Sequence, residues 1–210
     1  LKDGAIRWSS GELENTYSTP ILIDAGQRKQ VTLAAPKCLA GYDADTGELI
    51  WTHPFTNQWD THCTTPVDCG QGRVFYPSFG GGTLLQLSFS NSGTQVKELW
   101  TTKRVGAGQT NVLCIGDHLY GASGSDRASF YAAVKLADGS EAWRQRMPLS
   151  STLLAGDRMI VLDENGVLRL LRVSPEKLEE LCQAPLLENK AWTVPTLVAD
   201  RLYLRDQKHI

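Results

Sequence analysis

Short apolar runs alternate with polar turns along the whole chain, and the runs return in groups of four. The first group comprises residues 18–23, 30–34, 38–43 and 48–51, and turn-forming residues separate its members. Runs of four to six residues that are rich in β-branched and aromatic side chains are typical of strands. The pattern therefore predicts an all-β protein whose first unit is a four-stranded antiparallel sheet.

The group of four strands repeats along the chain. The residues that open the five groups are 46, 46, 40 and 43 positions apart: Pro20, Pro66, Val112, Thr152 and Pro195. Four-strand units with a period of about 40–45 residues indicate a β-propeller, in which each sheet is one blade. We expect a single propeller domain over residues 1–210, with four complete blades and parts of two others.

Each later group has its own expected strands. They are residues 64–66, 73–76, 84–89 and 96–100 in the second group, 110–112, 118–120, 130–135 and 141–143 in the third, 151–153, 158–161, 167–172 and 178–182 in the fourth, and 193–195 and 201–204 in the fifth. Ala5 to Trp8 is predicted as a short strand that ends a preceding blade. Residues 175–181 have helical spacing, but the repeat places a strand there, and we follow the repeat.

A tight turn followed by a tryptophan recurs near the end of the blades. Gly47 precedes Trp51 by four residues, and Gly139 precedes Trp143 by the same distance. Glycine can adopt the positive φ that such a turn requires. Four tryptophans, at positions 8, 51, 100 and 143, are separated by 43, 49 and 43 residues. One large ring at the same place in each blade can fill the gap to its neighbour and bury about 150–250 Å².

We therefore expect a structural role in blade docking for one set of residues. This set is Trp8, Asp43, Thr46, Gly47, Trp51, Trp100, Gly139 and Trp143. The fourth blade has Leu181 and Cys182 where the tryptophan is expected, so its contact with the next blade should be looser.

These residues resemble the pyrroloquinoline-quinone-like (PQQ-like) propeller repeat. The stretch Asp43-x-x-Thr46-Gly47-Glu48-x-x-Trp51 is similar to the tryptophan-docking motif of quinoprotein alcohol dehydrogenases. Two departures stand out: Gly41 replaces the usual alanine two residues before the aspartate, and the third blade has Leu136 at the aspartate position. The resemblance implies a propeller of seven or eight blades, of which this chain would be a fragment incomplete at both ends.

The resemblance leaves two functions open, because the family contains both BamB-like outer-membrane assembly lipoproteins and quinone-dependent enzymes. The first is a non-catalytic protein-interaction scaffold in the periplasm or cell envelope, with protein partners and a lipid anchor outside this chain. The second is part of a PQQ-dependent alcohol dehydrogenase whose catalytic residues lie outside this chain. The family's enzymes have vicinal cysteines beside the quinone and a calcium-binding set, and the sequence has no Cys-Cys pair and no calcium-loop pattern. We favour the scaffold and assign no catalytic, cofactor-binding or metal-binding residue.

Composition narrows the classes of partner. The 210 residues are 41% hydrophobic and 21% charged, which is ordinary for a globular protein. A net charge of −2 provides no basic field for nucleic acid. The longest apolar runs fall short of the eighteen or so residues that a membrane-spanning helix needs, and no targeting segment is visible.

The cysteines, the glycine-rich stretch and the tryptophans outside the repeat indicate no disulfide and no binding site. Cys63 and Cys69 are predicted on one strand about 20 Å apart, whereas a disulfide needs Cα atoms within about 7 Å. We expect no disulfide. The glycine-rich residues 79–83 are interpreted as a loop. Trp59 and Trp192 each lie just before the first strand of a blade, and we expect them to pack.

Overall fold

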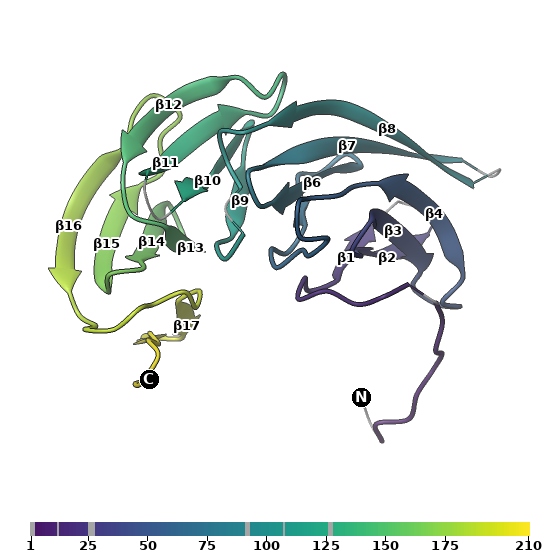
Figure 1. The fold of residues 1–210 in the computed structure, drawn as a ribbon, viewed down its shortest axis with the longest axis horizontal. Coiled ribbons are helices and arrows are strands. Elements are labelled where there is room, and N and C mark those ends of the chain that lie inside the picture. The colour runs from purple at the N-terminus through teal and green to yellow at the C-terminus, as the bar shows by residue number, and fades with distance from the viewer. Residues whose placement is uncertain (1–2, 12, 25–27, 91–92, 107, 126–127) are drawn as a thin grey trace. The chain divides into compact units, whose positions relative to one another are not determined.

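The chain forms sheets of four strands, as the repeat predicts. The computed structural model describes residues 3–11, 13–24, 28–90, 93–106, 108–125 and 128–210. Within these residues there is no helix, and the strands form four four-stranded sheets and one two-stranded sheet (Figure 1). In every sheet the spatial order of the strands follows their order in the chain, so that each sheet is a simple meander.

The strands of the five sheets have the following bounds. The first sheet contains β1 (Ile21–Asp24), β2 (Lys29–Ala34), β3 (Cys38–Asp43) and β4 (Leu49–Pro54). The second contains β5 (Val67–Asp68), β6 (Arg73–Ser78), β7 (Gly81–Ser90) and β8 (Gly93–Thr102). The third contains β9 (Val112–Ile115), β10 (His118–Ser125), β11 (Ala128–Lys135) and β12 (Glu141–Arg146). The fourth contains β13 (Ser150–Ala155), β14 (Arg158–Asp163), β15 (Val167–Arg172) and β16 (Glu179–Pro185), and β17 (Thr196–Val198) pairs with β18 (Arg201–Tyr203).

The chain groups into two compact units. The first comprises Leu1–Tyr76 and Leu84–Glu98, and the second comprises Pro77–Thr83 and Leu99–Ile210. The expectation of a single domain over residues 1–210 remains a prediction.

Each unit has a core that joins two sheets. In the first unit the buried residues come from the first and second sheets: Ile23, Ala34, Leu39, Trp51, Val74, Tyr76, Leu85 and Leu87. In the second unit they come from the third and fourth sheets and the link between them: Tyr120, Ala122, Tyr131, Ala133, Met147, Leu149, Met159, Val161 and Leu171. Because each sheet has apolar side chains on its faces, stacking against a neighbour removes them from water.

Polar contacts align the two sheets of the second core. Asn111, just before β9, receives the backbone N–H of Thr152 on its Oδ1 at 2.8 Å and donates Nδ2 to the Thr152 carbonyl at 2.7 Å. The hydroxyl of Tyr131 on β11 bonds the Thr152 hydroxyl at 2.9 Å. Thr152 is buried, so these bonds satisfy groups that water cannot reach.

Several local predictions are wrong. The expected strands at residues 64–66 and 193–195 are absent, since β5 begins at Val67 and β17 at Thr196. Residues 5–8 form no strand, because no neighbouring strand in the described part of the chain pairs with them. Cys63 and Cys69 do not share a strand, because β5 contains only Val67 and Asp68. The glycine-rich residues 79–83 are a loop only at Phe79 and Gly80, since β7 already begins at Gly81.

One other local prediction is confirmed. Residues 175–178 lie outside any helix and β16 begins at Glu179, as the repeat requires. The structure records no disulfide among the five cysteines, all of which lie in the described ranges. The described residues also contain no helix that could cross a membrane.

Candidate functional site

The turn after β3 receives the first of the recurrent tryptophans. The indole N–H of Trp8 donates to the Ala44 carbonyl at 3.0 Å. Oδ1 of Asp43 accepts the backbone N–H groups of Asp45 and Thr46, each at 2.9 Å, and shapes the turn. These bonds favour the carboxylate, so they hold the pKa of Asp43 below its ordinary value, with Thr46 the larger contributor.

Gly47 is required in this turn for two reasons. Its φ of 77° is unfavourable for residues with a side chain. A Cβ at this position would also lie 2.5 Å from the Trp8 ring. Thr46 supports the turn with its Oγ1, which accepts the backbone N–H of Glu48 at 3.3 Å.

The same arrangement recurs in the second unit. Trp100 on β8 donates its indole N–H to the Leu136 carbonyl at 3.0 Å, and a Cβ on Gly139 would lie 2.8 Å from its ring. Trp143 on β12 donates to the carbonyl of Ser174, in the turn after β15, at 3.1 Å. In all three cases the acceptor lies in a turn between the third and fourth strands of a sheet. We propose that these contacts dock one blade on the next.

Backbone hydrogen bonds show which residue of the third blade occupies the aspartate position of the motif. Gly139 donates its N–H to the Lys135 carbonyl at 3.0 Å, as Gly47 does to the Asp43 carbonyl at 2.9 Å. Lys135 therefore occupies the aspartate position, and Leu136 corresponds to Ala44. The prediction of Leu136 at that position is wrong by one residue.

Trp51 departs from this pattern. Its indole N–H donates to Oε1 of Gln30 at 2.8 Å, and Nε2 of Gln30 donates to Oγ1 of Thr94 at 2.7 Å. Gln30, which is 1% exposed, therefore links Trp51 to β8. It takes the place of the turn carbonyl that accepts the indole N–H of the other three tryptophans. The Trp51 ring lies against Gly41, where a Cβ would come within 2.1 Å of Nε1. This contact explains why glycine replaces the alanine of the motif.

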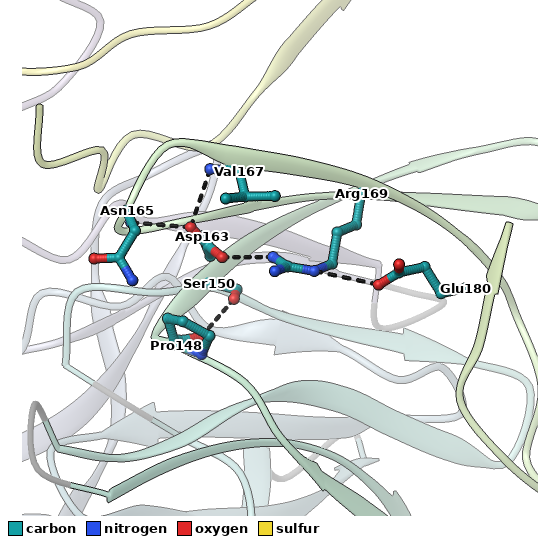
Figure 2. Close-up of polar contacts among 7 residues, drawn as sticks. All are labelled: Pro148, Ser150, Asp163, Asn165, Val167, Arg169 and Glu180. Atoms are coloured by element: carbon teal, nitrogen blue, oxygen red, sulfur yellow. Dashed lines mark hydrogen bonds and ion pairs between the residues drawn. The ribbon is translucent and has the colours of Figure 1, made fainter. Parts of the chain in front are cut away.

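A polar site lies at the turn between β14 and β15. Oδ1 of Asp163 accepts the backbone N–H groups of Asn165 at 2.9 Å and Val167 at 3.1 Å (Figure 2). Its Oδ2 accepts a bond from Arg169 on β15 at 2.5 Å, and Arg169 also contacts Glu180 on β16 at 3.3 Å. The Asp163 side chain is only 1% exposed, and the arginine compensates its charge.

The residue after Asp163 fixes the segment that follows the fourth sheet. The backbone of Glu164 donates to the Leu149 carbonyl at 2.8 Å and accepts from Ala191 at 3.1 Å. Its carboxylate, 8% exposed, accepts Nζ of Lys190 at 2.6 Å and the indole N–H of Trp192 at 3.3 Å. The Trp192 side chain is therefore only partly buried, with 43% of its surface exposed, so the expectation that it packs is met only in part.

These segments enclose a pocket of about 360 Å³. Its lining residues come from β11, from the end of β12 and the link after it, from the β14–β15 turn, and from the segment after β16: Ser129, Arg146, Met147, Pro148, Glu164, Asn165 and Lys190. In the parts of the chain that are described, no group of three or more His, Cys, Asp or Glu side chains is arranged to hold a metal ion. The arrangement can bind charged and hydrogen-bonding groups.

None of the predicted docking residues lines this pocket, and the prediction missed all seven lining residues. Ser150, whose hydroxyl donates to the Pro148 carbonyl at 2.6 Å, fixes the link that forms one wall. The sequence signal was Asp163 to Gly166, which indicates a turn. A turn signal alone does not reveal which other segments lie beside it.

The chain is similar to proteins with propeller folds. The profile of the family described as outer membrane protein assembly factor BamB matches residues 1–145 and, about one blade further along, residues 39–184. Among solved structures, BamB from Moraxella catarrhalis has a TM-score of 0.68 and 17% identity, and the match covers 97% of this chain and 61% of that chain. No curated protein sequence matches the chain.

Two further solved structures are similar. A europium-containing methanol dehydrogenase has a TM-score of 0.58 and 13% identity over 90% of this chain and 44% of that chain. The β-propeller domain of Cps50 (Swd1) from Myceliophteria thermophila has a TM-score of 0.57 and 11% identity, over 83% of this chain and 59% of that chain. The chain thus spans less than two thirds of each of these structures. At these identities the likeness shows the fold, and it confirms the predicted partial β-propeller.

The docking turn in the third blade can be tested at Gly139. We expect Gly139→Ala to lower the free energy of unfolding by about 2–4 kcal/mol, because it adds a clash with Trp100 to the strain of a positive φ. The matched control is Gly116→Ala, which has φ of 60° but no atom within 4 Å of the new Cβ, and should cost about 1–2 kcal/mol. Urea unfolding measures both, and equal losses would contradict the packing of Trp100 on Gly139.

The Asp43 turn should be sensitive to acid. The folded pKa of Asp43 is lowered, so its contribution to stability is present above the unfolded pKa of about 3.9 and is lost as pH falls through the folded pKa. We expect Asp43→Asn to weaken this loss of stability between about pH 5 and pH 2 and to be less stable than wild type at pH 7, since its amide oxygen can accept both backbone bonds but lacks the charge that strengthens them. Asp43→Ala should cost about 1–3 kcal/mol at pH 7. Thermal unfolding across this pH range tests the idea, and an unchanged pH profile in Asp43→Asn would refute it.

Proposed function

Since the chain belongs to the family of the outer membrane protein assembly factor BamB, we propose that it is a non-catalytic protein-interaction module that acts outside the cytoplasm, in the periplasm or cell envelope. Its partners are proteins that take part in outer membrane protein assembly, the process in the family's name. A lipid anchor, where one exists, lies outside this chain. The polar pocket at the β14–β15 turn carries this proposal.

Three properties of the pocket support protein binding. Its walls are built by backbone hydrogen bonds, such as that from Met147 N–H to the Ser129 carbonyl at 3.3 Å, so little ordering is required on binding. Its lining combines charged and amide groups with the apolar Met147 and Pro148. The half-exposed ring of Trp192 lies beside it, and tryptophan is enriched among the residues that dominate protein interfaces.

The segment after β16 adds to the rigidity of this surface. The Gly166 carbonyl accepts the N–H groups of Leu186 at 3.0 Å and Leu187 at 3.2 Å. Further along, Asp206 is 4% exposed and accepts Asn189 Nδ2 on Oδ2 at 3.0 Å and His209 N–H on Oδ1 at 2.7 Å. These bonds hold the pKa of Asp206 well below its ordinary value. A fixed surface of this kind suits a partner that docks without large rearrangement.

The alternative function is a portion of a PQQ-dependent alcohol dehydrogenase. The fold likeness to a methanol dehydrogenase favours it, but this likeness concerns the fold, which hosts more than one function. The vicinal cysteines of the family's enzymes are missing from this sequence. The interaction module is therefore the better supported of the two.

Site-specific crosslinking tests the module. The chain would be exported to the periplasm of a Gram-negative host that lacks its own BamB, with a photoreactive amino acid at position 165. We expect an adduct with a protein of the outer membrane assembly machinery. The control position is 205, where Arg205 is exposed and lines no part of the pocket. Absence of an adduct from position 165, or the same adducts from both positions, would overturn the proposal.

Quinone titration tests the alternative. We expect no stoichiometric binding of pyrroloquinoline quinone at micromolar concentration, with or without calcium, because the sequence lacks the vicinal cysteines and the calcium-binding set. Titration calorimetry on the folded chain measures this, with an apo methanol dehydrogenase as the positive control. A micromolar or tighter complex would favour the enzyme over the module.

A further inference from the structure

Three polar side chains in the pocket have unused hydrogen-bonding capacity. Ser129, Arg146 and Asn165 line it, and their side chains make no hydrogen bond or ion pair with any other group in the described part of the chain. Asn165 uses only its backbone N–H, which donates to Asp163. A guanidinium, an amide and a hydroxyl are thus available to a ligand.

The acidic groups near these side chains are already engaged. Asp163 and Glu180 both pair with Arg169. Glu164 accepts Lys190 and Trp192. The lining has two cations, Arg146 and Lys190, against one carboxylate, Glu164. Because Lys190 is compensated by Glu164, Arg146 carries the surplus positive charge.

We infer that Arg146 and Asn165 form a subsite for the carboxylate of an acidic side chain on a partner protein. The planar guanidinium can bind a carboxylate through two parallel hydrogen bonds. The Asn165 amide can donate to the same carboxylate or bond the partner's backbone. A pocket of about 360 Å³ is large enough for one glutamate side chain and its flanking backbone.

The chemistry selects a carboxylate over a phosphate. Glu164 and Lys190 offset each other, so the lining has one uncompensated cation, Arg146, whose single charge matches a monoanion rather than a dianion. The subsite is also organised before binding, because Asp163 holds the turn at both Asn165 and Val167. This inference rests on the proposed function and names the kind of group that the partner would present.

Defined peptides test the subsite. The probe is acetyl-Gly-Gly-Glu-Gly-Gly-amide, and its control is the same peptide with glutamine in place of glutamate. Binding is followed by NMR through the side-chain amide of Asn165 and the indole N–H of Trp192. We expect the glutamate peptide to shift both signals and to bind at least about tenfold more tightly than the glutamine peptide.

Variants of the pocket separate this role from folding. Arg146→Gln and Asn165→Ala should each weaken binding of the glutamate peptide, Arg146→Gln by about tenfold or more. Arg146→Lys keeps the charge but loses the planar fork and should fall between wild type and Arg146→Gln. Arg205→Gln, the same charge change at an exposed arginine outside the pocket, should bind within about twofold of wild type. Backbone spectra that match wild type establish folding for each variant.

Several results would overturn the inference. They are equal binding of the two peptides, absence of shifts at millimolar peptide, and unchanged affinity in Arg146→Gln. These failures are distinguishable from failure of the proposed function. If the peptide does not bind but position 165 still crosslinks to the assembly machinery, the subsite is wrong and the module stands. If the peptide binds and the crosslink is missing, the module is wrong and the subsite stands.

Discussion

A four-stranded sheet with apolar side chains on its faces cannot remain in water alone, and this constraint governs the whole chain. Stacking buries the faces, but apolar contact is non-directional and does not fix how one sheet lies on the next. The indole N–H groups of Trp8, Trp100 and Trp143 each bond one particular turn carbonyl, and we propose that such bonds supply that direction. Glycine lies beneath Trp8 and Trp100 because a Cβ there would meet the ring, whereas the turn that accepts Trp143 contains no glycine. On this proposal, burial stabilises neighbouring sheets within a unit, and the tryptophan bonds determine how they align.

The strands were predictable because the physical signals are local. Alternating apolar residues and turn-forming residues placed Cys38–Asp43 correctly to the residue. Prediction failed where a distant partner decides the outcome. Residues 5–8 have strand-like composition, but a strand exists only where another strand pairs with it. Gln30 is similar: its role between Trp51 and Thr94 depends on residues 21 and 64 positions away, and an isolated glutamine in a strand gives no sign of it.

The candidate pocket was beyond prediction for the same reason. Arg146 ends one sheet, Asn165 lies in the next, and Lys190 follows that sheet, so no stretch of sequence contains the site. What the sequence did contain was the turn from Asp163 to Gly166. Its carboxylate bonds two backbone N–H groups, and this positions the residues between them. Composition can locate such a turn, but only the packing of the fourth sheet against the third shows which charges meet there.

The two kinds of turn in these sheets have different freedom to vary. The turn between the third and fourth strands accepts a tryptophan in three sheets, and at Gly47 and Gly139 the ring leaves no room for a Cβ. The turn between the second and third strands accepts none of these indole N–H groups. It is Phe79 and Gly80 in the second sheet, whereas in the fourth it carries Glu164 and Asn165. The side chains of this turn can therefore vary without altering the tryptophan contacts. If one set of turns docks the sheets, as we propose, the other set is available for recognition, and the pocket at Asn165 lies at a turn of this second set.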